Sequence, residues 1–560
     1  MNSPFKPIED FIQWFNGIVW GVPMLALLLL TGLFLTFGLR GMSIKRIPYG
    51  FRQVFKKRTG NEEEGDVSPF AALMTALSST IGTGNIAGVA AAIAIGGPGA
   101  VCWMWVTAVV GTATKFSEGV LAVRYREIDA NGNRVGGPMY YIKNGLGPKW
   151  MWLASTFAFF GMIAAWGTGA SIQSLEVSNV LNSTYKVPPL LTAIVLALGA
   201  GAVILGGIKR IGTVASGLVP LMAGLYISAG IIVIFMNVGQ VPAAFGLIFK
   251  SAFGLQSAGT GVSIGLLMLA MKKGVARGIF SNEAGQGSAP IAHAAAQNND
   301  PVNQGVVAML GTVVDTLIVC TITALVILTS GVIAPECLAS PETLAQLVAD
   351  DQPRGCLTSS PLTASAFEAS LSGIGKHIVA IGLTVFAFTT IIGWSYYGER
   401  CATFLFSEKA ILPYRFAWIG VVFSSAAVLT LKTKDLIIEA GRVTKSTTST
   451  IIGEKSYEDI LLVDGKPFLI DEEPIELEDG VLSMDGTTVL LDGDAIQIDG
   501  LIGNIVNLFW LMADTLTGMM AAPNLLALVL LSPVVFKLAK EYFDKEKIAN
   551  DGLIDQDDIK

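Results

Sequence analysis

Two apolar segments contain polar, glycine-rich stretches whose backbone and side chains could bind charged ligands. The first stretch, residues 78–88, reads SSTIGTGNIAG, and the second, residues 278–290, reads GIFSNEAGQGSAP. Glycine and asparagine are poor helix formers, and a carboxylate is costly at membrane depth. We therefore expect both apolar helices to be interrupted here, which a bilayer tolerates only where the backbone is buried in protein or lines a cavity.

An interrupted helix offers both signs of partial charge to a ligand. The half-helix that follows Gly84 presents free N–H groups, which suit a carboxylate. Carbonyls near Phe280 and Ser281 suit an ammonium group, and those of residues 78–81 suit a hard cation. A zwitterionic amino acid bound together with a cation satisfies both signs at once.

Other interpretations of these stretches explain less. Gly82, Gly84 and Ala87 fit a dinucleotide-binding pattern, but that pattern needs a preceding strand in a soluble unit. Close helix packing accounts for the glycines but not for the asparagine and the glutamate. A membrane hydrolase needs a nucleophile beside a base, and no spacing supports Ser281 with His293. A sensor would need a signalling domain, and ATP-driven transport a phosphate-binding loop, GxxxxGK[ST], which the sequence lacks.

Composition places the elements that hold these stretches in a membrane. Of 560 residues, 52% are hydrophobic and only 14% are charged, against about 25% charged in an ordinary soluble domain. A net charge of −7 argues against a nucleic-acid partner, and two histidines and five cysteines argue against His-rich or multi-Cys metal sites. We predict an all-α polytopic protein of about eleven spans. The expected spans are 17–38, 68–95, 99–123, 150–181, 189–207, 212–235, one ending near 296, 305–330, 373–399, 412–431 and a kinked 503–538.

Basic residues orient these spans. Seven lysines and arginines lie between residues 40 and 58, which places this loop in the cytoplasm and the N-terminus outside. Without the first span, the others form two groups of five with opposite orientation, and each group opens on an interrupted span. Interrupted helices in corresponding places of two inverted halves point to a transporter site.

Residues 431–500 have a different character. They carry six basic and sixteen acidic residues, and Asp-Gly recurs between short apolar runs, which predicts β-hairpins. We expect a small β-rich extracytoplasmic insert; the alternatives are a solvated appendage without chemistry and a calcium site, although no EF-hand spacing is present.

The predicted domains are 1–430 for the first part of the transporter, 431–500 for the insert, 501–540 for the last transmembrane segment and 541–560 for an acidic cytoplasmic tail. A disulfide between Cys337 and Cys356 in the preceding outer loop stays open.

Several blocks of the sequence together resemble one known family. GIFSNEAGQGSAPIAHAA at 278–295 resembles the signature of the alanine/glycine:cation symporter family, and GTGNIAGVA at 82–90, GPMYYI at 137–142 and GWSYYGER at 393–400 are similar to further family blocks. The resemblance covers nearly the whole chain except the insert. It implies a leucine-transporter-like 5+5 inverted repeat with one extra N-terminal helix in a bacterial or archaeal cytoplasmic membrane. It also implies uptake of alanine or glycine coupled to Na⁺, less often to H⁺, and no enzyme activity.

The resemblance also implies where the ligands bind. The substrate residues would be Thr83, Gly84, Asn85, Gln173, Phe280, Ser281, Asn282 and Trp394. The N–H groups of Thr83 and Gly84 would hold the carboxylate, carbonyls of the second interruption would receive the ammonium, and Trp394 would keep the pocket small. Gln173 and Trp394 could instead serve only in helix packing.

Oxygen atoms of the first and eighth core helices would bind Na⁺. The expected ligands are Ser78, Thr80, Ile81, Asn85, Thr389 and Thr390, although the threonine hydroxyls could instead bond to their own helix. We expect Arg277 to pair with an acid at an outer gate, and Glu283 either to bond to the unwound segment or to carry protons. Asp315 and Asp514 are intramembrane acids without assignable partners, and Glu118 is expected to be solvated. Membrane lipid is the other expected partner, and the oligomeric state stays open.

Overall fold

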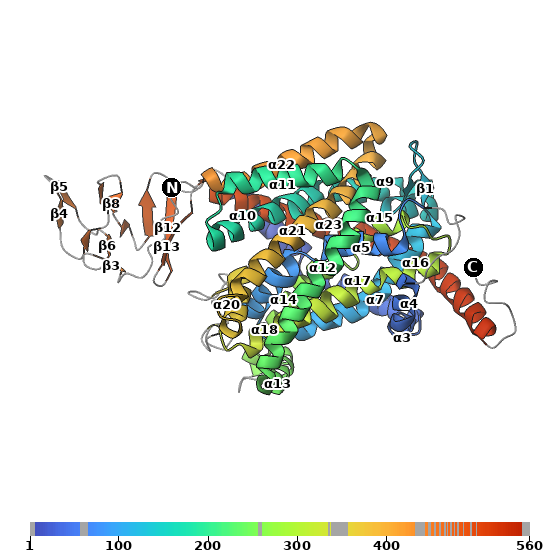
Figure 1. Ribbon diagram of the computed structural model, residues 1–560, viewed down its shortest axis with the longest axis horizontal. Coiled ribbons are helices and arrows are strands. Elements are labelled where there is room, and N and C mark those ends of the chain that lie inside the picture. The colour runs from blue at the N-terminus through green and yellow to red at the C-terminus, as the bar shows by residue number, and fades with distance from the viewer. Residues whose placement is uncertain are drawn as a thin grey trace.

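Long apolar helices make up most of the computed structural model, and together they form one bundle (Figure 1). The structure describes residues 6–55, 65–255, 260–333, 337, 357–431, short strands within 443–499, and 501–550. The predominance of long apolar helices among these residues confirms the expected mostly helical membrane architecture.

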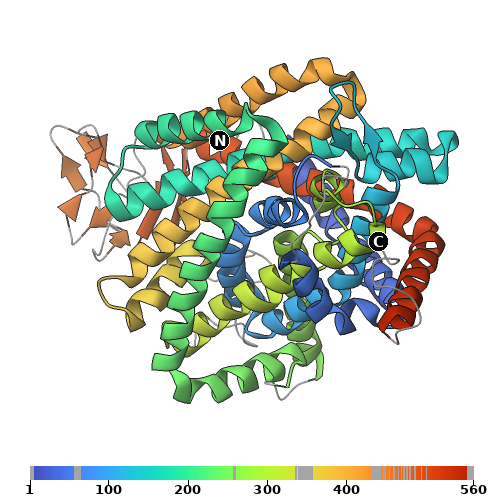
Figure 2. The same ribbon diagram turned by 45° about the vertical axis from the view of Figure 1, so that its right-hand side comes forward.

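The N-terminal part of the chain supplies the first broken helix and the helices around it. Its helices are α1 (Lys6–Val19), α2 (Val22–Gly38), α3 (Met42–Lys45), α4 (Ile47–Phe55), α5 (Pro69–Thr80), η1 (Gly84–Gly88), α6 (Val89–Gly96), α7 (Gly99–Arg124), α8 (Pro138–Tyr141), η2 (Ile142–Leu146), η3 (Pro148–Trp150), α9 (Met151–Ala164), η4 (Ala165–Ser171), α10 (Ile172–Tyr185), α11 (Pro189–Ile204) and α12 (Gly207–Met236). Figure 2 shows α12 crossing the bundle and leading into α13 at its lower edge.

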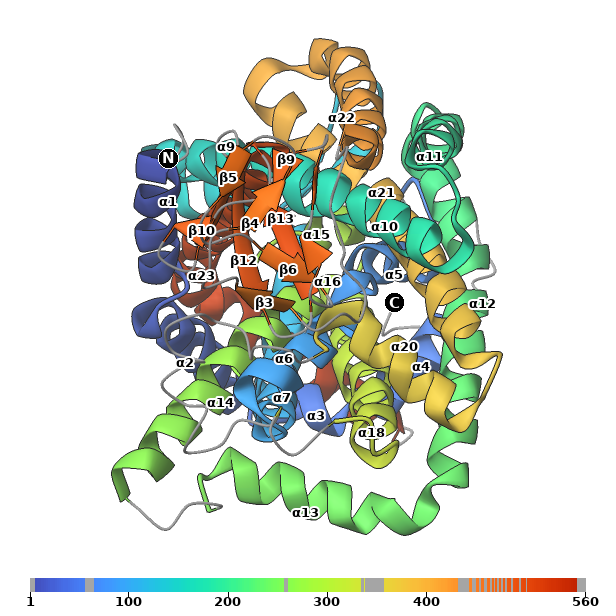
Figure 3. The same cartoon turned by 90° about the vertical axis from the view of Figure 1, so that its left-hand side faces the viewer.

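The second part of the chain supplies the second broken helix and the helices that pack against both breaks. Its helices are η5 (Val238–Gln240), α13 (Val241–Ala252), α14 (Thr260–Asn282), α15 (Ala289–Ala294), α16 (Pro301–Ala308), α17 (Leu310–Thr312), η6 (Val313–Cys320), α18 (Thr321–Thr329), α20 (Ser359–Ser370), α21 (Gly375–Phe406), η8 (Glu408–Ala410), α22 (Ile411–Leu431) and α23 (Leu501–Asn550). In Figure 3, seen from the side of the insert, α13 lies flat across one edge of the bundle.

Helix ends follow local sequence signals. Ser68 caps α5 by accepting a hydrogen bond from the N–H of Ala71 at 3.1 Å, and Pro69 begins the helix. Asp300 caps α16 in the same way by accepting from the N–H of Asn303, with Pro301 as the first helical residue. These caps satisfy N–H groups that a helix start leaves without a partner.

Eight described helices are long and apolar enough to cross a membrane, and the bent α5–α6 pair makes up to nine. Two further expected spans lie outside this set. Helix α11 has only 16 residues, and α14 carries Lys272, Lys273 and Arg277 within its length. The span count of about eleven and the inverted repeat therefore stay predictions. The last expected span, 503–538, falls within the single long helix α23, which contains Pro523 and Pro533.

Short antiparallel strands occur at two places. The hairpin β1 (Glu127–Ile128) and β2 (Arg134–Val135) lies at the opposite end of the bundle from the strands of the insert (Figure 1). The insert strands are β3 (Val443–Lys445), β4 (Thr450–Ile452), β5 (Lys455–Tyr457), β6 (Leu461–Val463), β7 (Lys466–Pro467), β8 (Leu469–Ile470), β9 (Glu473–Pro474), β10 (Leu477–Glu478), β11 (Val481–Met484), β12 (Thr487–Asp492) and β13 (Ala495–Asp499). The largest of their sheets has the order β10-β11-β12-β13, with sequential neighbours paired. Cys337 is disulfide-bonded, and Cys356 lies outside the described residues.

Candidate functional site

The first helix interruption lies between α5 and η1, where the chain bends by 53°. The side-chain oxygen of Asn85 accepts a hydrogen bond from the N–H of Gly82 at 2.9 Å, which closes the turn. The segment after it, Gly84–Gly88, is a π-helical turn in which every residue is buried. The start of this half-helix presents N–H groups toward the break, as the sequence predicts.

The second interruption begins three residues later than the sequence predicts. Phe280, Ser281 and Asn282 form the last turn of α14, and the chain leaves the helix at Glu283. Glu283, Gly285 and Gly287 have φ angles of +55°, +88° and +83°. Gly278 lies inside α14 without ending it, and the helix ends only where Glu283, Gly285 and Gly287 adopt positive φ, a backbone that glycine permits at little cost. The carbonyls of the last turn of α14 still face the break.

The two interruptions lie directly against each other. A Cβ atom placed on Gly84 would lie 3.5 Å from both the Cδ1 atom of Phe280 and the Cα atom of Ser281. The far ends of the broken helices are also joined, because the N–H of Gln297 donates to the carbonyl of Val67 at 2.7 Å, and Asp66 donates its N–H to Ala295. The N–H groups of one break therefore face the helix C-terminus of the other.

Asp315 connects the two interruptions through side chains. It lies on the π-helical segment η6 and is fully buried. Its carboxylate accepts hydrogen bonds from Asn85 Nδ2 at 2.7 Å, Ser281 Oγ at 2.9 Å and Thr316 Oγ1 at 2.6 Å. The sequence assigned Asp315 no partner, because Asn85 and Ser281 come from distant segments that only the fold brings together, and Thr316 is its neighbour in the chain.

These contacts change the expectation for Asn85 and agree with the rejection of a Ser281–His293 pair. Asn85 uses its oxygen on Gly82 and its amide nitrogen on Asp315, so it holds the breaks together in this structure rather than facing an open site. Ser281 donates to Asp315, and the ring of His293 contacts Gln304 at 2.8 Å, so the two form no nucleophile–base pair.

Gln173 and Trp394 border the interruptions from two other helices. Gln173 Nε2 donates to the hydroxyl of Thr83 at 3.2 Å, and its oxygen is buried without a hydrogen-bond partner among the described residues. The Trp394 indole is 2% exposed and donates to Glu283 Oε1 at 2.9 Å. Both side chains therefore border the interruptions, and the side-chain oxygen of Gln173 is an acceptor without a partner beside the first break.

The expected Na⁺ ligands gather where α21 crosses the end of α5. Thr390 Oγ1 lies 3.4 Å from the carbonyl oxygen of Ile81, and a Cβ atom on Gly393 would lie 2.7 Å from Ser78 Oγ. Thr389 and Thr390 also donate to the carbonyl of Phe386, at 2.8 and 3.1 Å. The sequence misses this carbonyl because α21 is unbroken at Phe386, and only an interrupted helix marks its carbonyls as candidates.

Ser78 and Thr80 likewise use their hydroxyls within their own helix, as Thr389 and Thr390 do on α21. Ser78 donates to the carbonyl of Thr75 at 2.8 Å, and Thr80 donates to the carbonyls of Ala76 and Leu77 at 3.3 Å each. The hydroxyl of Thr80 therefore makes a weaker candidate ligand than the Ile81 carbonyl. The carbonyl oxygen of Ser78 stays a candidate.

Buried carboxylates hold the second interruption. Glu283 accepts hydrogen bonds from Trp394 and from Ser288. Glu118, expected to be solvated, is instead 1% exposed and accepts from the N–H of Gly285 at 3.2 Å and from Asn524 Nδ2 at 2.7 Å. The expectation for Glu118 was wrong because its side of α7 packs against the second break and against Asn524 of α23, which the sequence alone does not specify.

Arg277 lies one turn before Phe280 on α14, and its guanidinium carbon is 5.9 Å from the ring centre of Phe280. Its charge acts on the carboxylate of Asp514 on α23, and this carboxylate accepts a hydrogen bond from Asn16 Nδ2 at 3.1 Å. Arg277 therefore acts on Asp514 through its charge, without a direct ion pair among the described residues.

Comparison with known proteins places this arrangement in a family. The sequence profile of the sodium:alanine symporter family matches residues 5–439 and 500–556. The sodium/alanine symporter AgcS of Methanococcus maripaludis is 49% identical over 419 residues, which cover 74% of this chain and 88% of AgcS. A transporter of Haemophilus influenzae is 40% identical over 99% of both chains. GlnT of Bacillus subtilis, whose name assigns it sodium/glutamine symport, is 32% identical over 99% of this chain and 94% of its own.

Solved structures resemble the chain only distantly. MhsT in complex with L-phenylalanine has a TM-score of 0.44 and 13% identity, over 85% of this chain and 98% of MhsT. The family match, by contrast, spans both helix interruptions and every candidate site residue. The chain therefore belongs to the sodium:alanine symporter family, whose members are Na⁺-coupled amino-acid transporters and not enzymes.

Proposed function

We propose that this protein takes up alanine or glycine together with Na⁺ by alternating access. The observation that carries the substrate choice is the close approach of the two interruptions. A Cβ atom on Gly84 would already touch Phe280 and Ser281 at 3.5 Å, and the Trp394 indole lies on the second break. Space between the breaks suits an amino acid with a very short side chain, and the name of AgcS agrees with alanine.

Opposite partial charges orient the substrate. The N–H groups at Thr83 and Gly84 hold the carboxylate, because they begin a half-helix. The ammonium lies against the last carbonyls of α14, at Phe280, Ser281 and Asn282, where a helix dipole is negative. The unpartnered oxygen of Gln173 is a further acceptor at the first break.

One Na⁺ ion binds between α5 and α21 in this proposal. Its ligands are the carbonyls of Ser78 and Ile81 and the hydroxyls of Thr389 and Thr390, with the carbonyl of Phe386 as an added candidate. The separation of 3.4 Å between Thr390 and Ile81 leaves both oxygens available to one ion. All of these are oxygen atoms, which hard cations prefer.

Two alternatives need direct tests. Glutamine transport is the function that the name of GlnT suggests. The side chain of glutamine, however, needs more room than the closely packed breaks provide. Proton coupling would make Glu283 the carrier. Its hydrogen bonds to Trp394 and Ser288 instead support a role in holding the unwound segment.

The same proposal fixes the orientation in a bacterial or archaeal cytoplasmic membrane. The N-terminus and the insert lie outside, and the C-terminus lies in the cytoplasm. The hairpin β1–β2, with Arg134 in it and Arg126 just before it, lies at the end opposite the insert, and Arg400 donates to Asp129 of its turn at 3.1 Å. Arginines concentrated at that end agree with a cytoplasmic face.

Uptake into proteoliposomes tests the proposal. Labelled alanine, glycine and glutamine are offered with an inward gradient of Na⁺, K⁺ or protons. We expect alanine or glycine to accumulate only with Na⁺, and equal uptake under all three gradients would refute coupling to Na⁺. Asn85→Ala should abolish accumulation, because it removes the bonds to Gly82 and Asp315. Asn237→Ala is the matched control, since Asn237 bonds to Ser370 away from both breaks.

A further inference from the structure

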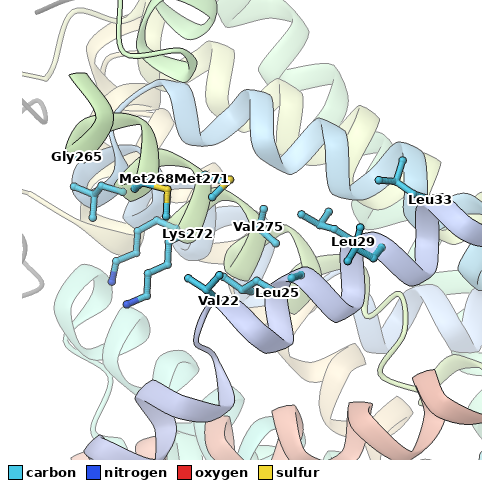
Figure 4. Close-up of a pocket in the computed structure, with 13 residues that line it drawn as sticks. Val22, Leu25, Leu29, Leu33, Gly265, Met268, Met271, Lys272 and Val275 are labelled. Carbon is cyan, nitrogen blue, oxygen red and sulfur yellow. The ribbon is translucent and has the colours of Figure 1, made fainter. Parts of the chain in front are cut away.

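A groove of about 580 Å³ separates the extra N-terminal helix α2 from the broken helix α14 (Figure 4). Six residues of α2 between Val22 and Leu33 line one wall, and all of them are valine, leucine or alanine. Helix α14 forms the other wall with apolar residues such as Met268 and Met271 and with two lysines. The groove has the volume of a ligand pocket, ~300–1,000 Å³, but almost none of its polarity.

The two lysines lie at one end of this groove. Lys272 and Lys273 both contribute to its lining, and Figure 4 shows Lys272 at the end of the groove opposite Leu33. Lys272 is exposed and makes no ion pair with the residues that the structure describes. The charges of Lys273 and Arg277 act on the carboxylate of Asp514 on α23. Lys272 is therefore the positive charge available to a ligand in the groove.

The depth of Lys272 matches the surface of a bilayer. Lys272 lies eleven positions before Glu283, where α14 unwinds. At a rise of 1.5 Å per residue this separation is about 16 Å. Because unwound segments lie near the bilayer midplane, and the hydrocarbon core is about 30 Å thick, Lys272 reaches the level of the headgroups. The apolar wall from Val22 to Leu33 then extends from that level toward the midplane.

We propose that the groove binds an acyl chain of an anionic phospholipid whose phosphate contacts Lys272. The apolar lining of the groove suits the acyl chain, and Lys272 at headgroup depth suits the phosphate of the same lipid. A second copy of the chain would have to bury Lys272 against an apolar surface, which is costly without a counter-charge. The bound lipid would join α2 to α14, the helix that ends at Asn282 beside the second interruption. Lipid binding does not depend on the proposed substrate.

Native mass spectrometry of the purified protein with phosphatidylglycerol or phosphatidylcholine tests the site. We expect one phosphatidylglycerol to be retained in preference to phosphatidylcholine. Lys272→Gln should weaken phosphatidylglycerol binding about fivefold, as the loss of one lysine at a membrane surface predicts. Lys272→Arg keeps the positive charge and should bind phosphatidylglycerol as the wild type does. Lys250→Gln is the matched control, because Lys250 is an exposed lysine of α13 outside the groove.

A second variant tests the apolar half of the site. Ala26 lines the groove from α2, so Ala26→Trp should fill it and displace the lipid while the lysines stay in place. Its unfolding temperature and its elution as a single species in size-exclusion chromatography establish whether Ala26→Trp folds. If Ala26→Trp does not fold, the result for Lys272→Gln decides the question. Equal retention of both lipids, unchanged binding by Lys272→Gln, a detergent molecule as the only occupant, or a dimer joined through this face would each overturn the proposal.

Discussion

The indole N–H of Trp394 donates a hydrogen bond of 2.9 Å to the carboxylate of Glu283, in the second helix interruption. Four residues earlier on α21, Thr390 donates to the carbonyl of Ile81 in the first interruption at 3.4 Å. Residues four apart lie on the same face of a helix. A single turn of α21 therefore contacts both interruptions, and a cation that binds at Thr390 acts on the helix that also holds the substrate site.

Trp394→Phe tests this link, because phenylalanine keeps the ring but removes the N–H. Glu283 would lose one of its two donors, and a hydrogen bond to a charged group contributes ~1.5–3 kcal/mol. We expect Na⁺-driven uptake to fall at least tenfold. Trp418→Phe is the control, since the Trp418 indole is also buried but has no partner among the described residues. Equal uptake by the two variants would contradict a role for the N–H.

Thr390→Ala tests the proposed cation site. The variant removes one oxygen ligand and keeps the packing of α21, so the Na⁺ concentration for half-maximal uptake should rise about tenfold, which corresponds to ~1.4 kcal/mol. Thr390→Ser keeps a hydroxyl, so its Na⁺ concentration for half-maximal uptake should equal that of the wild type. Thr384→Ala serves as the control, because the Thr384 hydroxyl only bonds to the carbonyl of Ala380 in its own helix. A Na⁺ dependence like that of the wild type in Thr390→Ala would remove this residue from the site.

Gly393→Ala tests the contact between α21 and α5. The new Cβ atom would lie 2.2 Å from Ser79 Oγ and 2.7 Å from Ser78 Oγ, so the helices must separate. Overpacking of this kind costs ~1–3 kcal/mol. We expect a lower unfolding temperature together with weaker Na⁺ dependence. Gly382→Ala on the same helix is the control, since its Cβ atom would meet Tyr226 at an ordinary 3.6 Å. Identical behaviour of the two alanine variants would show that the contact is unimportant.

Glu368 provides a prediction about pH outside the spans. Its carboxylate accepts hydrogen bonds from the backbone N–H groups of Lys376 at 2.9 Å and Gly373 at 2.6 Å, at the start of α21. These bonds hold the pKa of Glu368 below its ordinary value of 4.5. A carboxyl group with a lowered pKa stabilises the folded state above its unfolded pKa, and the stabilisation is lost as the pH falls through the lowered value.

Glu368→Gln should therefore lower the unfolding temperature at pH 7, and the difference from wild type should shrink as the pH falls below about 4.5. Thermal unfolding in detergent at several pH values measures it. Glu541→Gln is the control, because Glu541 is an exposed carboxylate 3.9 Å from Lys537 with no backbone donor in the described structure. A difference that persists unchanged at low pH would mean that the charge of Glu368 does not contribute.

The sequence predicted where the helices break better than what holds the breaks together. Glycine and asparagine within an apolar run are local signals, and Gly82 and Gly285 both fall at the interruptions. The end of α14 was placed three residues early because the turn is set by positive φ at Glu283, which residue type does not reveal. Helix boundaries depend on caps and on packing as well as on propensity.

Long-range partners were the part that sequence could not supply. Glu118 and Asn524 meet although 406 positions separate them, and Asn524 also donates to the carbonyl of Gly285 at 2.9 Å. Charged and amide groups inside predicted spans marked such residues as functional candidates. Their pairing follows from how α7, α14 and α23 pack, which no pattern in a single chain specifies.

Removal of the insert tests whether it takes part in transport. The family profile matches residues on both sides of 440–499 and skips this segment, while the transporter of Haemophilus influenzae aligns with 99% of the chain. The strands of the insert lie at one end of the bundle, away from α5, whose last turn leads into the first break (Figure 1). A short glycine–serine linker in place of residues 440–499 should therefore leave Na⁺-driven uptake within about twofold of wild type, because surface loops tolerate such changes. Surface expression measured in parallel separates a loss of transport from a loss of protein. Loss of uptake at normal expression would assign the insert a direct role in the transport cycle.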